Sequence, residues 1–140
     1  MLRDTETIVA ELNGYCGNNT DWRGLDRLVE ELFLRPITAA GIDAMLGVFE
    51  RHPTHDGFGV FWTLLHGIES AAGYEPHLLR SVRRRPSLFG VYMINRILNV
   101  GEKDIGDVSW ISVLKEVSSC PGIAPEVQET AGRYLGKHAN

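Results

Sequence analysis

The chain has 140 residues, of which 44% are hydrophobic, and it carries a net charge of −4. A chain of this length builds one ordinary domain around a single core, so we expect one domain over residues 1–140. A general nucleic-acid binder is basic, and an isoelectric point near 5.7 argues against that class. We therefore expect no direct contact with nucleic acid.

The amino terminus has no long apolar run typical of a signal peptide, and no stretch of about eighteen apolar residues is available to span a membrane. We therefore expect a cytoplasmic protein without membrane contact. Neither Cys16 nor Cys120 sits in a CxxC or metal-spaced cluster, so we expect reduced thiols in the core rather than a disulfide framework. In that compartment the Asn-Asn-Thr sequon at 18–20 has no role.

Apolar residues recur at spacings of three and four, which is the helical period, and strand patterns are nearly absent. The pattern predicts an all-α fold of about eight helices. In chain order we place them at residues 5–14, 21–34, 38–51, 57–70, 75–85, 87–99, 107–119 and 124–136.

Three prolines, Pro53, Pro86 and Pro121, are 33 and 35 residues apart, and each falls where one predicted helix stops before another begins. The residues eight, seven and four positions before each proline are apolar and share one helical face. They are Met45, Leu46 and Phe49 in the first unit, Leu78, Leu79 and Val82 in the second, and Val113, Leu114 and Val117 in the third. Pro36 repeats half a unit, after Leu28, Val29 and Leu32.

Helical hairpins that recur at such a period stack on one another, because one hairpin cannot cover its own apolar face. We predict a short right-handed α-solenoid of the HEAT type, with hairpins at about residues 37–70, 74–100 and 106–137. The alternative is an irregular helical bundle in which the prolines fall at similar intervals by chance.

Charge is unevenly spread along the chain. Residues 1–75 hold twelve acidic and five basic side chains, whereas residues 76–101 hold five arginines and no acidic residue. Arg83, Arg84 and Arg85 occupy the last turn of a predicted helix, where each exposed cation stabilises the helix dipole by about 0.3–1 kcal/mol. We expect these arginines to close the helix and pair within the chain. A phosphate contact is the alternative, although such sites favour helix amino termini and glycine-rich loops.

A small metal-dependent enzyme would require several ligand-type side chains to converge, since nitrogen and oxygen ligands hold zinc or iron. The candidates are His52, His55, Asp56, His66 and Glu69, whose spacing matches no known ligand signature. The Gly-Phe-Gly segment at 57–59 is not a dinucleotide loop, and we expect its glycines to permit close helix packing. No nucleophile elbow is present. We predict neither an enzyme nor a bound metal or cofactor.

Two predicted second helices carry polar stripes that share one helical face. Tyr92, Asn95, Arg96 and Asn99 form one stripe, and Thr63, His66 and Glu69 form the other. If the hairpins stack, the stripes lie side by side on a concave surface, where solenoids bind partners. Tyr and Arg are favoured interface anchors, so Tyr92 and Arg96 are expected to contribute most. Ordinary solvent-facing stripes are the alternative.

Most aromatic residues have apolar neighbours and are expected in the core. They are Trp22, Phe58, Phe61, Trp62, Phe89 and Trp110. Trp22 and Tyr74 also begin predicted helices beside polar residues, so contact with a partner stays open for these two.

The helix order over roughly residues 38–137, with the segments "FWTLLHGIES" and "RRRPSLFGVYMINRILN", resembles small HEAT-like immunity proteins of bacterial polymorphic-toxin and contact-dependent growth inhibition systems. The resemblance implies a cytoplasmic protein that binds a cognate toxin domain and blocks its active site or its access to substrate. It carries over no binding residues by motif. The acidic first half suits a basic toxin, such as a nuclease, and we expect the protein to be a monomer.

Two other functions stay open from the sequence. A HEAT-like adaptor or regulatory module would share these features without a neighbouring toxin gene, so genomic context separates it from an immunity protein. A small metal-dependent enzyme would show metal in the purified protein.

Overall fold

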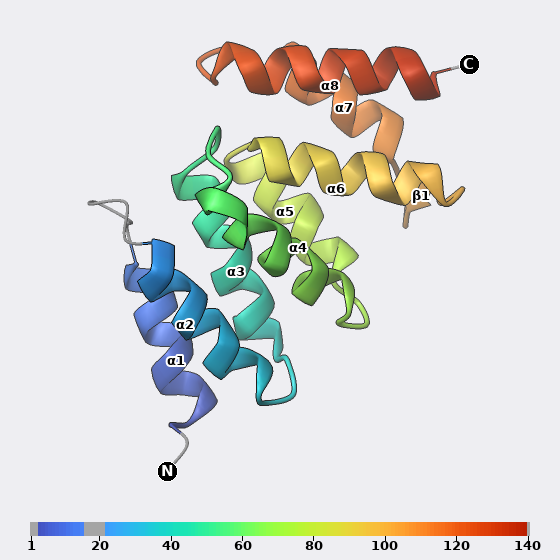
Figure 1. Cartoon of the computed structure of the whole chain (residues 1–140). Coiled ribbons are helices and arrows are strands. Elements are labelled where there is room, and N and C mark those ends of the chain that lie inside the picture. Colours follow the sequence, from blue (N-terminus) through green and yellow to red (C-terminus); the bar gives the residue numbers. More distant parts are fainter. Residues whose placement is uncertain (1–2, 16–21, 140) are drawn as a thin grey trace.

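The computed structural model describes residues 3–15 and 22–139, which Figure 1 shows as a succession of helices coloured from blue to red. Eight α-helices lie within these residues, with one 3-10 turn and one antiparallel pair of short strands. The α-helices are α1 (Thr5–Gly14), α2 (Trp22–Phe33), α3 (Ala39–Arg51), α4 (Val60–Glu69), α5 (Glu75–Arg84), α6 (Leu88–Asn99), α7 (Trp110–Ser118) and α8 (Pro125–His138). The 3-10 turn η1 spans Gly57–Gly59, and β1 (Asp104–Ile105) pairs with β2 (Val108–Ser109). The predicted all-α class with about eight helices is confirmed.

Local side-chain caps fix where several helices begin. Thr38, Ser87 and Ser109 each accept a backbone N–H from three residues further on, at the first turns of α3, α6 and α7. The helix predicted over 57–70 differs, because the chain first forms η1 and α4 begins at Val60. The strand pair was not predicted, since two-residue strands are too short to show an alternating pattern.

The helices pair in chain order into four hairpins, and helices at the same position in successive hairpins pack together. Among the first helices, α3 contacts both α1 and α5, and among the second helices α4 contacts α2 and α6. Helix α6 also contacts α8, and Figure 1 shows the progression from α1 and α2 at the lower left to α8 at the top. The right-handed superhelix and the HEAT classification stay predictions.

Polar pairs link the first helices of successive hairpins at the period of the prolines. Each pair joins residues 33 or 34 positions apart. The pairs are Asp43 with His77 (2.7 Å), Glu50 with Arg84 (2.8 Å) and Arg83 with Glu116 (3.2 Å). The loops meet as well, because the Leu88 N–H donates to the Pro53 carbonyl over 2.8 Å. Equivalent positions of neighbouring hairpins therefore lie opposite one another.

The core contains the apolar face that was predicted before each proline. Every member of the three triplets is buried except Leu79, which is only partly buried. Successive helical residues point about 100° apart, so Leu79 lies at the edge of the face that its neighbour Leu78 buries. The prediction of full burial was wrong for Leu79. Trp22 is also in the core, at 5% exposure, so it is not an open contact for a partner.

No helix within residues 3–15 or 22–139 is long and apolar enough to cross a membrane. Cys120 is a partly buried free thiol, whereas Cys16 and the sequon at 18–20 lie outside the described residues. The cytoplasmic location stays a prediction.

Candidate functional site

The seven predicted partner-binding residues lie on α4 and α6, which pack side by side. They are Thr63, His66 and Glu69 on α4, and Tyr92, Asn95, Arg96 and Asn99 on α6. Thr63, His66 and Asn99 are exposed, and the other four are partly buried. Contacts with neighbouring helices account for this burial, and they divide the stripe into two parts.

The first part is an ion pair between Arg96 and Glu69. Nε and Nη2 of Arg96 donate to the two carboxylate oxygens of Glu69 over 2.7 and 2.9 Å. His66 Nδ1 lies 3.9 Å from the same carboxylate. The hydrogen bond to Glu69 raises the pKa of Arg96. Arg96 therefore joins α6 to α4, and a partner meets a neutralised pair at this position.

A groove of about 410 Å³ opens beside this ion pair. Its walls include Tyr74, Glu75 and Glu102 as well as Glu69 and Arg96. Burial raises the pKa of Tyr74 to about 12, and its protonated phenol can donate a hydrogen bond. Tyr74 is therefore a possible hydrogen-bond donor in the wall of this groove.

The second part of the stripe lies towards α8. Asn95 Oδ1 is 2.7 Å from His138 Nε2, and the ring centroid of Tyr92 is 6.5 Å from that of Tyr134. Tyr92 also stacks on Trp62, with ring planes 7° apart and centroids 5.7 Å apart. Burial raises the pKa of Tyr92. Tyr92 and Asn95 thus contact side chains of α8, while Glu69 and Arg96 pair between α4 and α6.

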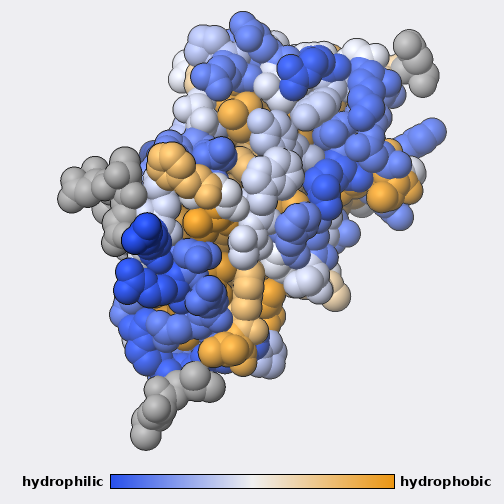
Figure 2. Space-filling model, in the orientation of Figure 1, coloured by the Kyte–Doolittle hydropathy of each residue, from blue (hydrophilic) through white to orange (hydrophobic). Residues whose placement is uncertain are grey.

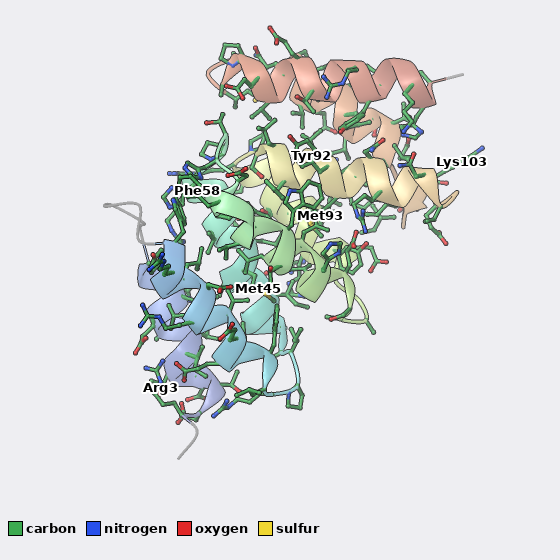
Figure 3. The ribbon with its side chains drawn as sticks, in the orientation of Figure 1. Arg3, Met45, Phe58, Tyr92, Met93 and Lys103 are labelled. Carbon is green, nitrogen blue, oxygen red and sulfur yellow. The ribbon has the colours of Figure 1, made fainter. Side chains whose placement is uncertain are left out.

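Two aromatic side chains that were expected in the core are exposed instead. Phe58 is 77% exposed and Trp62 is 41% exposed. Figure 3 labels Phe58 at the left side of the molecule, just before α4. The prediction was wrong for these residues because apolar neighbours in the sequence determine neither where Phe58 points from a tight turn nor which side of α4 carries Trp62. Large exposed apolar side chains that gather on one face mark interaction sites.

A strained turn holds Phe58 outward. Its φ of 51° lies in the left-handed region, which bulky residues rarely adopt, and Gly57 and Gly59 also have positive φ. Two side-chain acceptors fix the turn. His55 Nδ1 accepts the Gly57 N–H over 2.7 Å, and Asp56 Oδ1 accepts the Phe58 N–H over 3.0 Å. Backbone strain of this kind is common at functional sites.

The inner side of the turn packs tightly on the core. A Cβ at Gly57 would lie 2.6 Å from the ring of Phe61, which is fully buried. The prediction that the glycines of this segment permit close packing is confirmed for Gly57. A Cβ at Gly59 would meet no atom within 4 Å, so this glycine provides the left-handed backbone instead.

A second groove, of about 380 Å³, lies between this turn and the start of α6. It is lined by Thr54, His55, Asp56, Trp62, Leu88, Phe89 and Tyr92. We call Phe58, Trp62, Tyr92 and this groove the aromatic face; Phe58 and Tyr92 are labelled in Figure 3. Figure 2 shows apolar surface near η1 and α4 between hydrophilic regions.

The side chains considered for a metal site do not converge. Among the described residues, no three or more histidine, cysteine or acidic side chains gather as potential ligands. His52 and His55 instead pack on the Trp22 ring, at centroid distances of 5.2 and 4.6 Å. His66 and Glu69 lie together on α4. The geometry therefore gives no support to a metal-dependent enzyme.

Pairing within the chain is confirmed for two of the three clustered arginines. Nε and Nη2 of Arg84 donate to the buried Glu50, and Arg83 reaches Glu116 on α7. The hydrogen bond to Glu50 raises the pKa of Arg84. Arg85 is exposed after the end of α5. The absence of nucleic-acid binding stays a prediction.

A local signal for the aromatic face is present in the sequence. Phe58 stands between two glycines directly after Asp56, and this pattern favours a tight turn with positive φ. The stacking of Trp62 on Tyr92 has no comparable signal, because it depends on how α4 packs against α6.

The sequence matches no family model, and neither a curated protein nor a solved structure matches it.

Proposed function

We propose that the protein is an immunity protein that binds a toxin domain and blocks its active site or the access of its substrate. The observation that carries the binding function is Phe58, held outward at positive φ. Its ring contacts His55, which lines the same groove as the stacked Trp62 and Tyr92. Aromatic side chains are favoured anchors because they bury a large area at a small entropic cost. The resemblance of residues 38–137 to small HEAT-like immunity proteins supports a toxin as the partner.

The energetics of Phe58 favour a partner that covers it. A left-handed conformation costs a residue with a Cβ roughly 1–2 kcal/mol, and glycine would avoid this cost. A phenylalanine that is 77% exposed contributes little to the core, whereas its full burial at an interface stabilises a complex by about 1.5–3 kcal/mol. Burial in a complex thus offsets the cost of the strained turn.

The polar stripe is proposed as the rim of the same interface. Thr63 and His66 follow Trp62 on the exposed side of α4, and the Arg96–Glu69 pair lies further along. Polar rims exclude water from an apolar centre and fix orientation. The acidic first half would speed association with a basic toxin. We propose that the protein acts as a monomer in the cytoplasm.

The test is protection of cells that express the toxin domain encoded beside this gene. Phe58→Ala and Trp62→Ala should abolish protection, because truncating a buried anchor typically costs about 2 kcal/mol or more, near a thirtyfold loss of affinity. Circular dichroism must show that each variant still folds.

Leu34→Ala is the matched control. Leu34 is an exposed apolar side chain, 64% exposed, next to Phe33, whose ring packs on Gly67 towards the other end of α4. The Leu34→Ala variant should protect cells as well as the wild type does. Loss of protection in Leu34→Ala, with Phe58→Ala still protective, would move the contact to the acidic surface around Glu30 and Glu31.

Tyr92→Ala and Arg96→Ala test the polar stripe in the same assay. Loss of protection with an intact fold would include these two residues in the interface. The result that would favour an adaptor over an immunity protein has two parts. No toxin is encoded beside the gene, and an aromatic-face variant fails to bind another protein that the wild type binds.

A further inference from the structure

The groove of the aromatic face combines aromatic rings with one exposed carboxylate. Trp62, Phe89 and Tyr92 supply the rings, and the Asp56 side chain is 65% exposed. One oxygen of Asp56 accepts the Phe58 N–H over 3.0 Å. Within the described chain, no hydrogen bond reaches the other oxygen, so it is open to a ligand.

The charge of Asp56 is not neutralised by the described part of the molecule. No arginine or lysine there lies within 4.0 Å of its carboxylate. The basic side chain within this distance is His55, whose Nδ1 is 3.8 Å away. That nitrogen accepts the Gly57 N–H over 2.7 Å, and a ring nitrogen that accepts an N–H carries no proton.

Arg133 is the cation that acts on Tyr92. Burial is the main cause that raises the pKa of Tyr92, Tyr134 adds to it, and Arg133 opposes it, ahead of smaller contributions from Glu126 and Asp56. Arg133 already lies over the Tyr134 ring, with its guanidinium carbon 5.4 Å from the ring centroid. Arg133 is thus engaged with a ring, and among the described residues no ion pair joins it to Asp56.

We infer that this groove binds an arginine side chain of the partner, an inference that rests on the proposed function. A guanidinium is planar, can form two hydrogen bonds to a carboxylate and can stack on an aromatic ring. A lysine ammonium is more strongly hydrated and has no flat face. An apolar side chain would cover Asp56 without giving its charge a partner, which is costly.

The inference can be tested on the isolated protein without the toxin. The probe is an acetyl-Gly-Arg-Gly-amide peptide, and the measurement is the indole N–H resonance of Trp62, assigned with Trp62→Phe. A single side chain should bind with a Kd on the order of 1 mM. The citrulline peptide, which has the same shape without the charge, should bind at least about tenfold more weakly. The lysine peptide should also bind more weakly.

Asp56→Asn is the matched variant, because its amide oxygen still accepts the Phe58 N–H while the charge is gone. It should lose the preference for arginine over citrulline. Glu102→Gln removes a carboxylate from the other groove and should keep that preference. Equal binding of the arginine and citrulline peptides, equal binding of the lysine peptide, or no arginine-dependent shift at about 10 mM peptide would each overturn the inference.

The toxin-protection assay, applied to Asp56→Asn, Glu102→Gln and Phe58→Ala, distinguishes a failure of this inference from a failure of the proposed function. If Asp56→Asn weakens protection and Glu102→Gln does not, the partner places an arginine in the groove. If Phe58→Ala abolishes protection while Asp56→Asn retains it in full, the arginine site is wrong and the proposed function stands. If neither Phe58→Ala nor Asp56→Asn affects protection, the aromatic face is not the interface, and both the arginine site and the proposed binding surface are wrong.

Discussion

The guanidinium of Arg84, at the end of α5, closes on the carboxylate of Glu50, near the end of α3, with two hydrogen bonds of 2.8 Å. The Glu50 side chain is 7% exposed and also accepts the Ser81 hydroxyl over 2.8 Å. A buried carboxylate is costly unless its oxygens are paired, and these three hydrogen bonds offset that cost. The contact links the α3–α4 hairpin to the α5–α6 hairpin.

Replacing Arg84 should therefore destabilise the fold. Arg84→Met leaves the Glu50 carboxylate buried with the Ser81 hydroxyl as its remaining described partner, and the loss should be about 1–3 kcal/mol. Arg85→Met removes the adjacent exposed arginine and should change stability by less than about 0.5 kcal/mol. Urea unfolding measures both. Equal midpoints for the two variants would show that the pair contributes nothing.

The neighbours Leu78 and Leu79 should differ sharply on truncation. Leu78 is fully buried, so Leu78→Ala opens a cavity and should cost about 2–5 kcal/mol. Leu79 is partly buried, and Leu79→Ala should cost about 1 kcal/mol. Leu114 corresponds to Leu79 in the next hairpin but is fully buried, so Leu114→Ala should cost as much as Leu78→Ala. A larger loss for Leu79 than for Leu78 would contradict the orientation of α5.

Helix positions could be predicted because their signals are local. Caps such as Ser87, and prolines between helices, act within a few residues, so the sequence alone places α6 and its neighbours closely. The burial of Glu50 could not be foreseen in this way. It sits in the last turn of α3, where a charged residue is normally solvated, and its partner Arg84 is 34 residues away.

The candidate site was predicted in part. The helical period placed the seven polar residues on α4 and α6, yet it did not reveal that Arg96 pairs with Glu69 or that Asn95 faces α8. Those contacts depend on the rotation of each helix against its neighbours. Phe58 was missed because the glycines beside it favour a turn with positive φ but do not report which way the phenylalanine side chain points from that turn.

Phe58→Gly should leave the fold intact and keep or raise its stability, by up to about 1 kcal/mol, because glycine adopts positive φ without strain. Phe61→Ala, three residues on, removes a fully buried ring and should cost about 3–5 kcal/mol. Thermal unfolding measures both. Clear destabilisation by Phe58→Gly would mean that the exposed ring supports the fold, and the argument for a partner would weaken.

Stability should fall as the pH drops below the ordinary pKa of histidine, in part through His52. Burial is the main cause that lowers the pKa of His52, and the charge of Arg51 adds to it. The unfolded chain then binds more protons than the native state below about pH 6.5. The contribution of neutral His52 is complete above that pH and is lost as the pH falls towards its native pKa.

His52→Gln removes this contribution, so the variant should lose less stability than the wild type between about pH 7.5 and 5.5. Urea midpoints at several pH values measure the difference. Parallel profiles for the two proteins would show that His52 is as easily protonated in the native state as in the unfolded chain.

Arg96→Ala should reduce stability only slightly. The Arg96 side chain is 41% exposed and Glu69 is 20% exposed, and pairs that water reaches contribute about 0–1 kcal/mol. Arg96→Lys keeps the charge but loses the two-bond geometry, and should recover part of the effect. Raising the salt concentration should narrow the gap between wild type and Arg96→Ala. A loss of several kcal/mol would rule out this variant as a clean probe of binding.

At η1, residues that pack in the core and residues that face solvent alternate within a few positions of the sequence. Gly57 and Phe61 are constrained by the packing between them, so a change at either position disturbs the core. Phe58, Thr63 and His66 project into solvent and can be exchanged without loss of packing. Single substitutions at these exposed positions can therefore change which partner is bound during evolution. Each intermediate sequence still folds, because the core contacts are unchanged.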